Sequence, residues 1–274
     1  MAVAARLHPT AILDATARIP DSCEIGPYSV IGPGVELGAR VAIGPHVLIE
    51  RDTRVGDDCR IWKGAVLGTD AQDLKYMGEP SWLEVGAGTM IREYATLNRG
   101  TSAGGTTVVG AGSLIMAYAH VAHDCKVGRN VVLANSVQMA GHVEIGDRVM
   151  VGGLTGIHQF VRIGSHSMVG GASRVVQDVA PFTLVAGNPC SCFGLNRIGL
   201  RRQGFSTESI ATLRGAYRRL FQADVPAGKA AQDFDLRGAS AEVVEFVRFV
   251  THSTRGVTTP RARSTQEIER PGCP

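Results

Sequence analysis

The chain has 274 residues and a formal net charge of +3. A charge this small, with no basic run interleaved with aromatic residues, argues against nucleic-acid binding. Aromatic residues make up only 5% of the chain and 34 residues are glycine, so we expect a thin, repetitive core of Val, Ile and Leu rather than a large aromatic core.

The N-terminal segment and the cysteines both indicate a cytoplasmic protein. The first twenty residues lack the apolar run of a signal peptide, and no later stretch approaches the roughly 18 apolar residues of a transmembrane helix. In the cytoplasm the six cysteines, Cys273 among them, are expected to be reduced thiols. Cys190 and Cys192 lie close in sequence, but without matching His or Cys nearby they are a weak signal for a metal.

An aliphatic residue recurs at every sixth position through most of the chain. The runs extend from Leu7 to Leu67, from Val85 to Leu97 and from Val109 to Val175, and glycine often follows the aliphatic residue directly. Period six fits neither an amphipathic helix nor an alternating strand, but it fits an all-β solenoid with stacked inward ladders. The pattern resembles the hexapeptide-repeat transferases, which implies a left-handed parallel β-helix.

The hexads have two interruptions before they end. Polar or glycine-rich segments at 69–83 and 99–107 are expected to be loops outside the solenoid. The pattern stops near Ala180, so we expect a β-helix over residues 1–190 and a small helical domain over 191–256. Residues 257–274 carry no apolar pattern and are expected to be disordered.

Two helices are predicted in the C-terminal domain. Ser206 is a candidate N-cap for a helix whose apolar residues recur at helical spacing from Ile210 to Phe221. Ser240 is a candidate N-cap for a second helix over Ala241–Val250.

Histidines gather between residues 120 and 166. In the hexapeptide-repeat family three hexads make one coil, 6 × 3 = 18 residues, so residues 18 apart stack on one another. By this rule Gly141 lies over His123, His142 lies over Asp124, and Gln159 lies one coil further along. His158 adjoins this patch, and His120 comes shortly before it in the chain.

The stacked patch has the residues of a catalytic centre. A neutral histidine beside a carboxylate can act as a general base, and the N–H of a glycine can donate to a developing oxyanion. Histidines that are merely tolerated on a solenoid surface are the alternative. The convergence of four histidines with Asp124, Gly141 and Gln159 favours a site.

Zinc is a competing interpretation of the same histidines. Some hexapeptide β-helices bind Zn²⁺ between subunits through three histidines, two of them five residues apart. Five residues after His142 and His158 the chain carries Asp147 and Ile163, so this spacing predicts no metal site.

Further segments extend the resemblance: QDLKYMGEP, NRGT, AHVAHDC, AGHV, HQF, MVGGAS, the GL-R-R-x-GF stretch near 199–205, and STRG. In this order they resemble the UDP-N-acetylglucosamine O-acyltransferases, which carry out the first step of lipid A synthesis. The resemblance runs from about His8 to Gly256. It implies transfer of an (R)-3-hydroxyacyl group from acyl carrier protein to the 3-hydroxyl of UDP-N-acetylglucosamine, without a cofactor. It also implies a homotrimer with its sites in the clefts between subunits.

The resemblance assigns the catalytic roles to three residues. His123 deprotonates the sugar hydroxyl, Asp124 orients His123, and the Gly141 N–H holds the thioester oxyanion. Gly171 ends the acyl groove and sets the chain length, around the fourteen-carbon class.

The same resemblance implies a set of substrate contacts. Ile198 and Gln203 stand where some members carry Glu and Arg, so the nucleotide contacts are weaker inferences than the catalytic pair. The implied substrate-binding residues are Gln72, Asp73 and Lys75 in the first loop, His120, His142, His158 and Gln159 along the sugar–nucleotide pocket, and Asn196 and Arg202 at the nucleotide end.

Three other functions fit parts of this pattern. The related N-acyltransferase of the same pathway has an extra N-terminal domain, for which hexads beginning at Leu7 leave no room. A non-catalytic scaffold would not need the His123–Asp124 pair, and a zinc hydratase would need bound metal. The sequence leaves open the acyl length and whether the acceptor carries a 3-hydroxyl or a 3-amine.

Overall fold

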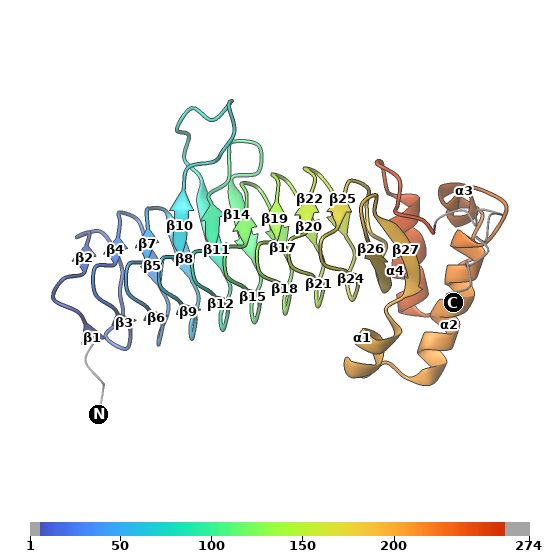
Figure 1. The fold of residues 1–274 in the computed structure, drawn as a ribbon, viewed down its shortest axis with the longest axis horizontal. Coiled ribbons are helices and arrows are strands. Elements are labelled where there is room, and N and C mark those ends of the chain that lie inside the picture. Colours follow the sequence, from blue (N-terminus) through green and yellow to red (C-terminus); the bar gives the residue numbers. More distant parts are fainter. Residues whose placement is uncertain (1–5, 261–274) are drawn as a thin grey trace, which may run out of the picture.

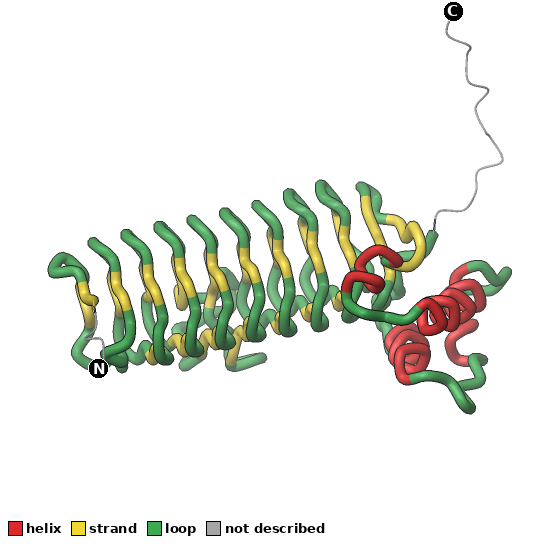
Figure 2. The backbone as a smooth tube through the Cα atoms, turned by 90° about the horizontal axis from the view of Figure 1, so that it is seen from below, coloured by secondary structure: helices red, strands yellow, loops and turns green. Residues whose placement is uncertain are grey.

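The computed structural model describes residues 6–260 and shows a three-sided β-helix that ends in short α-helices (Figure 1). Figure 2 shows the coils stacked along one axis, with the helices gathered at one end. The predicted left-handed parallel β-helix with a small C-terminal helical domain is confirmed, and each side of the prism is one parallel sheet.

Sheet A forms one side and continues into the C-terminal region. Its final strand runs antiparallel to the one before it, so a hairpin closes the end of the prism. The strands of sheet A are β1 (Arg6–Leu7), β3 (Glu24–Ile25), β6 (Ala42–Ile43), β9 (Arg60–Ile61), β12 (Met90–Ile91), β15 (Leu114–Ile115), β18 (Val132–Leu133), β21 (Met150–Val151), β24 (Met168–Val169), β26 (Thr183–Ala186) and β27 (Ser191–Leu195).

Sheet B follows sheet A in each coil, and sheet C follows sheet B. The strands of sheet B are β2 (Ile12–Leu13), β4 (Val30–Ile31), β7 (Leu48–Ile49), β10 (Val66–Thr69), β13 (Thr96–Asn98), β16 (His120–Val121), β19 (Gln138–Met139), β22 (Gly156–Ile157) and β25 (Arg174–Val175). The strands of sheet C are β5 (Glu36–Leu37), β8 (Thr53–Val55), β11 (Trp82–Val85), β14 (Thr106–Val109), β17 (Lys126–Val127), β20 (Glu144–Ile145) and β23 (Arg162–Ile163).

The six-residue period sets the register between coils. Ile25 pairs with Ile43, and Val121 pairs with Met139, each 18 residues on. The repeated aliphatic residues point inward and are almost fully buried, which forms ladders along the axis. The corners leave little room: a Cβ at Gly32 would lie 1.7 Å from the Glu50 carbonyl oxygen of the next coil, so only glycine fits there.

The outward residues give the three faces different characters. On sheet C they alternate in charge, and Arg54 forms ion pairs with Glu36 and Glu84 across neighbouring coils. On sheet A they become apolar from β12 onward, and Met90 and Met150 are exposed. The apolar outward row of sheet A is Met90, Leu114, Val132, Met150, Met168 and Leu184.

Both predicted loops leave the same corner, between sheets B and C. The first connects β10 to β11 and the second connects β13 to β14, and both rise from one edge of the prism in Figure 1. The hexads resume in register after each loop, because Leu67 pairs with Leu97 and Leu97 pairs with Val121.

The helical domain contains α1 (Arg197–Arg202), α2 (Thr207–Phe221), α3 (Ala227–Gln232) and α4 (Ala241–Thr251). The predicted caps are confirmed, because Ser206 and Ser240 accept backbone N–H groups at the starts of α2 and α4. The short helices α1 and α3 were not predicted. No helix within residues 6–260 has both the length and the apolar character needed to cross a bilayer.

The disorder expected from residue 257 onward does not hold for residues 257–260. Val257 and Thr258 are buried, and the Thr258 N–H donates to the Asp178 carbonyl at 2.7 Å. These backbone bonds to the last coil replace the apolar pattern that the sequence lacks. The expected disorder of 261–274 and the thiol of Cys273 lie outside the described residues, while the other cysteines are free thiols.

Candidate active site

The corner between sheets B and C carries His123 directly after the two loops. The fourth residue of each corner hexad adopts a left-handed backbone, with φ near 60° at Asp124, His142 and Phe160. This conformation is uncommon for residues other than glycine, and its repetition stacks the three side chains in one row. The stacking predicted from 18-residue coils is confirmed.

His123 and Asp124 form a buried pair. The His123 Nδ1 lies 2.8 Å from the Asp124 Oδ2, and their side chains are 9% and 1% exposed. A carboxylate at Nδ1 selects the tautomer that donates from Nδ1, which leaves Nε2 unprotonated. The pair therefore has the arrangement of a general base.

The Asp124 carboxylate accepts hydrogen bonds from more than His123. Burial by itself raises the pKa of this carboxyl. Hydrogen bonds from the Thr101 N–H, the His123 ring and the Thr101 hydroxyl outweigh burial, so its pKa lies below the usual range. Asp124 is thereby kept ionised beside His123. The sequence analysis noted the NRGT motif but gave Thr101 no role.

Gly141 lies directly over the His123 ring. A Cβ at Gly141 would lie 2.5 Å from the ring Cε1 and 2.6 Å from Nε2. The Gly141 N–H has no hydrogen-bond partner among residues 6–260, as is also true of the corresponding corner residues His123 and Gln159. The expected oxyanion donor is thus an unpaired N–H of the residue that covers the base.

A groove of about 550 Å³ runs along sheet B in front of His123. It continues across neighbouring coils, and the outward residues of sheet B form its floor. Of the predicted site residues it gathers Gln72, His120, His123, Gly141, His158 and Gln159, together with the unpredicted Gln138 and Arg174.

His120 is a neutral polar group in this groove. Its Nδ1 forms a 2.7 Å hydrogen bond with the Thr96 hydroxyl. Burial lowers the pKa of His120, and the nearby His123 lowers it further. His120 therefore favours its uncharged form in the fold.

His142 occupies a different place from the one expected. Its Nε2 lies 3.6 Å from the Asp124 Oδ2, and its ring stacks on Phe160 with centroids 4.6 Å apart. The left-handed corner turns it toward Asp124, so it packs beside the carboxylate and does not line the groove.

A C-terminal arginine holds the end of the groove. Arg255 donates to the Gln159 carbonyl at 2.9 Å, to the Val176 carbonyl at 3.3 Å and to the His158 Nδ1 at 3.1 Å. Because a guanidinium only donates, His158 accepts at Nδ1 and carries its proton on Nε2. The STRG motif, which had no assigned role, supplies this contact.

The first loop brings one of its three predicted residues to the groove. Gln72 lines the groove, whereas Asp73 turns back and accepts the Lys75 N–H at 3.0 Å. Lys75 is exposed and does not line the groove, so within one chain Asp73 and Lys75 are apart from His123.

The predicted nucleotide-end residues lie on another face. Asn196 and Arg202 line a cavity of about 820 Å³ against sheet A, because the β26–β27 hairpin carries α1 to that side. Asn196 caps α1 by accepting the Gly199 N–H, and it donates to the His166 carbonyl at 2.9 Å. Ile198 lines the same cavity and is exposed. One chain does not bring these residues to the histidine groove.

Gly171 lies on a different corner from His123. It connects β24 to β25, between sheets A and B, and it is exposed. The separation from His123, 171 − 123 = 48 residues, is two whole coils plus two thirds of a third, and that fraction carries it to another edge of sheet B. A path from His123 to Gly171 therefore does not follow one corner of a single chain.

Three potential metal ligands also meet at this site. Ligand atoms of His123, Asp124 and His142 all lie within 4.8 Å of one another, which the spacing argument from sequence did not foresee. However, Asp124 Oδ2 already accepts from His123 and from the Thr101 hydroxyl, and Oδ1 accepts the Thr101 N–H. The carboxylate is thus arranged to accept hydrogen bonds.

Comparison with known proteins adds a family to this geometry. A model described as UDP N-acetylglucosamine O-acyltransferase, domain 2, matches residues 178–258, and a bacterial transferase hexapeptide model matches 16–51 and 106–141. The chain is 49% identical over 258 residues to an acyl-[acyl-carrier-protein]–UDP-N-acetylglucosamine O-acyltransferase of Burkholderia vietnamiensis, covering 92% of this chain and 98% of the relative.

Solved structures agree with the sequence relatives. A UDP-N-acetylglucosamine O-acyltransferase from Moraxella catarrhalis matches with a TM-score of 0.89 and 42% identity, over 92% of this chain and 99% of that one. A UDP-N-acetylglucosamine acyltransferase from Francisella novicida matches with a TM-score of 0.89 and 33% identity, over 92% and 93%.

Proposed function

The chain belongs to the acyl-[acyl-carrier-protein]–UDP-N-acetylglucosamine O-acyltransferases, and we propose that it moves an (R)-3-hydroxyacyl group from acyl carrier protein to the 3-hydroxyl of UDP-N-acetylglucosamine. This is the first step of lipid A synthesis. The observation that carries the proposal is the buried His123–Asp124 pair, with Nδ1 and Oδ2 at 2.8 Å, at the wall of an open groove.

The reaction follows from the tautomer of His123. Its free Nε2 takes the proton of the sugar 3-hydroxyl as the oxygen attacks the thioester carbonyl. The Gly141 N–H donates to the oxyanion of the tetrahedral intermediate. The intermediate then collapses, the C–S bond breaks, and the carrier thiolate takes the proton from His123. A thioester is already activated, so the scheme uses no cofactor.

The remaining substrate roles belong to the same proposal. His120, His158 and Gln159 bind the sugar nucleotide along the groove, and Gln72 contacts the hydroxyl of the acyl chain. His142 acts through Asp124. Asp73, Lys75, Asn196 and Arg202 contact substrate from a second subunit.

We infer a homotrimer whose sites lie between subunits. The apolar outward row of sheet A, from Met90 to Leu184, needs a cover that one chain does not supply. Packing one subunit's sheet A beside the next subunit's sheet B would bring Asn196 and Arg202 toward a neighbouring histidine groove. The same packing makes Gly171 the end of an acyl groove that begins at the neighbour's His123.

We also place the enzyme in the cytoplasm, where acyl carrier protein supplies the thioester. The free thiols of Cys23, Cys59, Cys125, Cys190 and Cys192 support a reducing compartment.

Mass spectrometry of the product tests the function. The purified protein is incubated with UDP-N-acetylglucosamine and a mixed pool of 3-hydroxyacyl carriers, in parallel with the 3-amino analogue of the sugar. We expect an ester on the 3-oxygen and only slight use of the amine. An amide product formed faster than the ester would reassign the acceptor, and no acyl transfer to either sugar would overturn the proposal.

A further inference from the structure

The second loop covers the Asp124 carboxylate. A Cβ at Gly104 would lie 2.4 Å from Asp124 Oδ1, and a Cβ at Gly100 would lie 3.0 Å from the same atom. The loop backbone therefore packs against the carboxylate at distances that only glycine allows. This packing leaves the Asp124 side chain 1% exposed although its neighbour His123 borders the groove.

Thr101 lies between these glycines and makes two hydrogen bonds to Asp124. Its N–H donates to Oδ1 at 2.9 Å, and its hydroxyl donates to Oδ2 at 2.7 Å. Oδ2 also accepts His123 Nδ1, so one oxygen is shared between Thr101 and the base. Thr101 is buried and does not line the groove, so substrate does not contact it.

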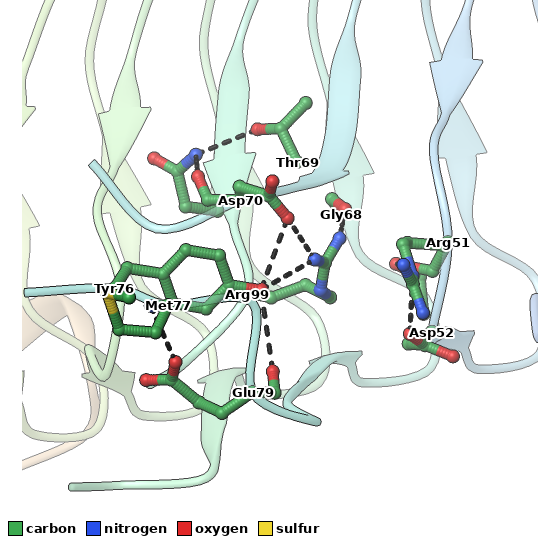
Figure 3. A network of polar contacts seen from close by, with 11 residues as sticks. Arg51, Asp52, Gly68, Thr69, Asp70, Tyr76, Met77, Glu79 and Arg99 are labelled. Atoms are coloured by element: carbon green, nitrogen blue, oxygen red, sulfur yellow. Dashed lines mark hydrogen bonds and ion pairs between the residues drawn. The ribbon is translucent and has the colours of Figure 1, made fainter. Parts of the chain in front are cut away.

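The loop that carries Thr101 is anchored to the first loop. Arg99 is buried, and its guanidinium donates to the Gly68 carbonyl, to the Asp70 carboxylate, and to the Tyr76 hydroxyl at 3.1 Å (Figure 3). This contact joins the start of the second loop to both ends of the segment that presents Gln72.

A second link joins the two loops at Glu79. Its carboxylate accepts the Ser102 N–H at 3.1 Å and the Met77 N–H at 2.9 Å. Thr101 thus lies between two fixed points, Arg99 on one side and Ser102 on the other. Its hydroxyl is held in place by contacts outside the His123–Asp124 pair.

We propose that Thr101 is a positioning residue for the acyl transfer, and that it fixes the Asp124 carboxylate so that Oδ2 faces His123 Nδ1. This inference rests on the proposed roles of His123 and Asp124. A carboxylate can rotate about its Cβ–Cγ bond, and donors on both oxygens remove that freedom. With the carboxylate fixed, the imidazole keeps both its tautomer and the direction of Nε2.

Loss of the Thr101 hydroxyl has two separable consequences. Oδ2 loses one of its donors, so the imidazole is less firmly oriented and the chemical step slows. The carboxylate also loses a bond that favours its charged form, which moves the titration of the coupled pair upward. Binding of UDP-N-acetylglucosamine should change little, because Thr101 does not reach the groove.

Thr101→Val, which has nearly the same shape without the hydroxyl, tests the proposal beside Thr101→Ser, which keeps it. Thr89→Val is the matched control. Thr89 is a fully buried threonine whose hydroxyl donates to the Gly110 carbonyl at 3.2 Å, away from the pair. For each variant kcat and KM are measured against pH with the full-length protein, and thermal unfolding reports the fold.

We expect Thr101→Val to lower kcat about ten-fold at neutral pH with KM for the sugar nucleotide within about two-fold. The acidic limb of its kcat/KM profile should move to higher pH, and Thr101→Ser should restore most of the rate. Thr89→Val should keep the wild-type profile. A folded Thr101→Val enzyme with the wild-type kcat and pH profile would overturn the proposal, as would a Thr101→Ser enzyme equally impaired in kcat.

If Thr101→Val does not fold, Thr101→Ser alone decides, because it must then match the wild-type pH profile. A wild-type protein that transfers no acyl group rejects the proposed function instead. The two failures are therefore distinguishable.

Discussion

Gly141 lies so close over His123 that a methyl group there would come within 2.5 Å of the imidazole Cε1. The Gly141 backbone does not have a positive φ, so alanine is acceptable to the chain and only the ring must move. We expect Gly141→Ala to remain folded and to lose about 10²-fold or more in kcat, because a displaced base loses its alignment with the sugar hydroxyl.

Gly156→Ala is the control for this substitution. It adds the same methyl group to the same groove, but a Cβ there has no neighbour within 4 Å. Steady-state kinetics should show a near-normal kcat for Gly156→Ala. Equal losses in the two variants would mean that the groove rejects any added methyl and that the contact between Gly141 and His123 has no special role.

The pH dependence of stability should reflect His120. Its pKa is lowered in the fold by burial, so the unfolded chain binds a proton at a higher pH than the native protein does. Stability is thus fully present above the ordinary histidine pKa of about 6.5 and falls as pH drops from there toward the lower, native value. His120→Asn keeps a polar group near Thr96 but removes this titration.

Thermal unfolding between pH 7.5 and 5 measures the effect. The wild-type melting temperature should fall more over this range than that of His120→Asn. Parallel curves for the two proteins would show that His120 takes up its proton equally in the folded and unfolded chain.

Acyl-chain selectivity should depend on Gly171. A Cβ at this position meets the Gly153 carbonyl oxygen at 3.1 Å, a contact that a small shift relieves, and the residue is otherwise exposed. Gly171→Met should therefore fold. If residue 171 ends the acyl groove of a neighbouring subunit, the Met side chain shortens it, and each excluded methylene loses about 0.8 kcal/mol of burial.

Competition between ten- and fourteen-carbon 3-hydroxyacyl carriers tests this ruler. Wild-type enzyme should prefer the longer chain and Gly171→Met a chain several carbons shorter, with catalysis retained. Unchanged selectivity in a folded Met variant would mean that Gly171 is only a corner glycine of the repeat.

Activity should be independent of metal ions, although His123, Asp124 and His142 lie close enough to bind one. The carboxylate oxygens already accept hydrogen bonds from Thr101 and His123, so a metal would have to displace the donors that orient the base. Dialysis against a chelator should leave kcat unchanged. Stoichiometric zinc, with activity lost on chelation and regained with Zn²⁺, would reject the mechanism.

The repeat made most of the fold predictable. A fixed six-residue period determines coil length, register and stacking, which is why the neighbours of His123 and Asp124 in the next coil could be named from numbers alone. The helix caps Ser206 and Ser240 were found because capping is a local interaction. The short α1 and α3 were missed, since six residues carry little periodic signal.

Other parts of the site depend on contacts that a repeat does not encode. Thr101 reaches Asp124 from 23 residues away because the loop between them folds back. Asn196 was expected at the substrate, but the β26–β27 hairpin places it on sheet A, where its amide caps α1. His142 stacks on Asp124 as predicted, and the left-handed corner, invisible in the sequence, turns its ring out of the groove.

The turnover of His123→Ala tests the central claim most directly. The variant removes the base while leaving Asp124 held by Thr101, so the fold and the substrate groove should persist. Acyl transfer from a 3-hydroxyacyl carrier to UDP-N-acetylglucosamine is followed for wild-type and variant protein of matched thermal stability. The account predicts a loss of at least about 10²-fold in kcat. A folded variant that turns over at the wild-type rate would contradict it.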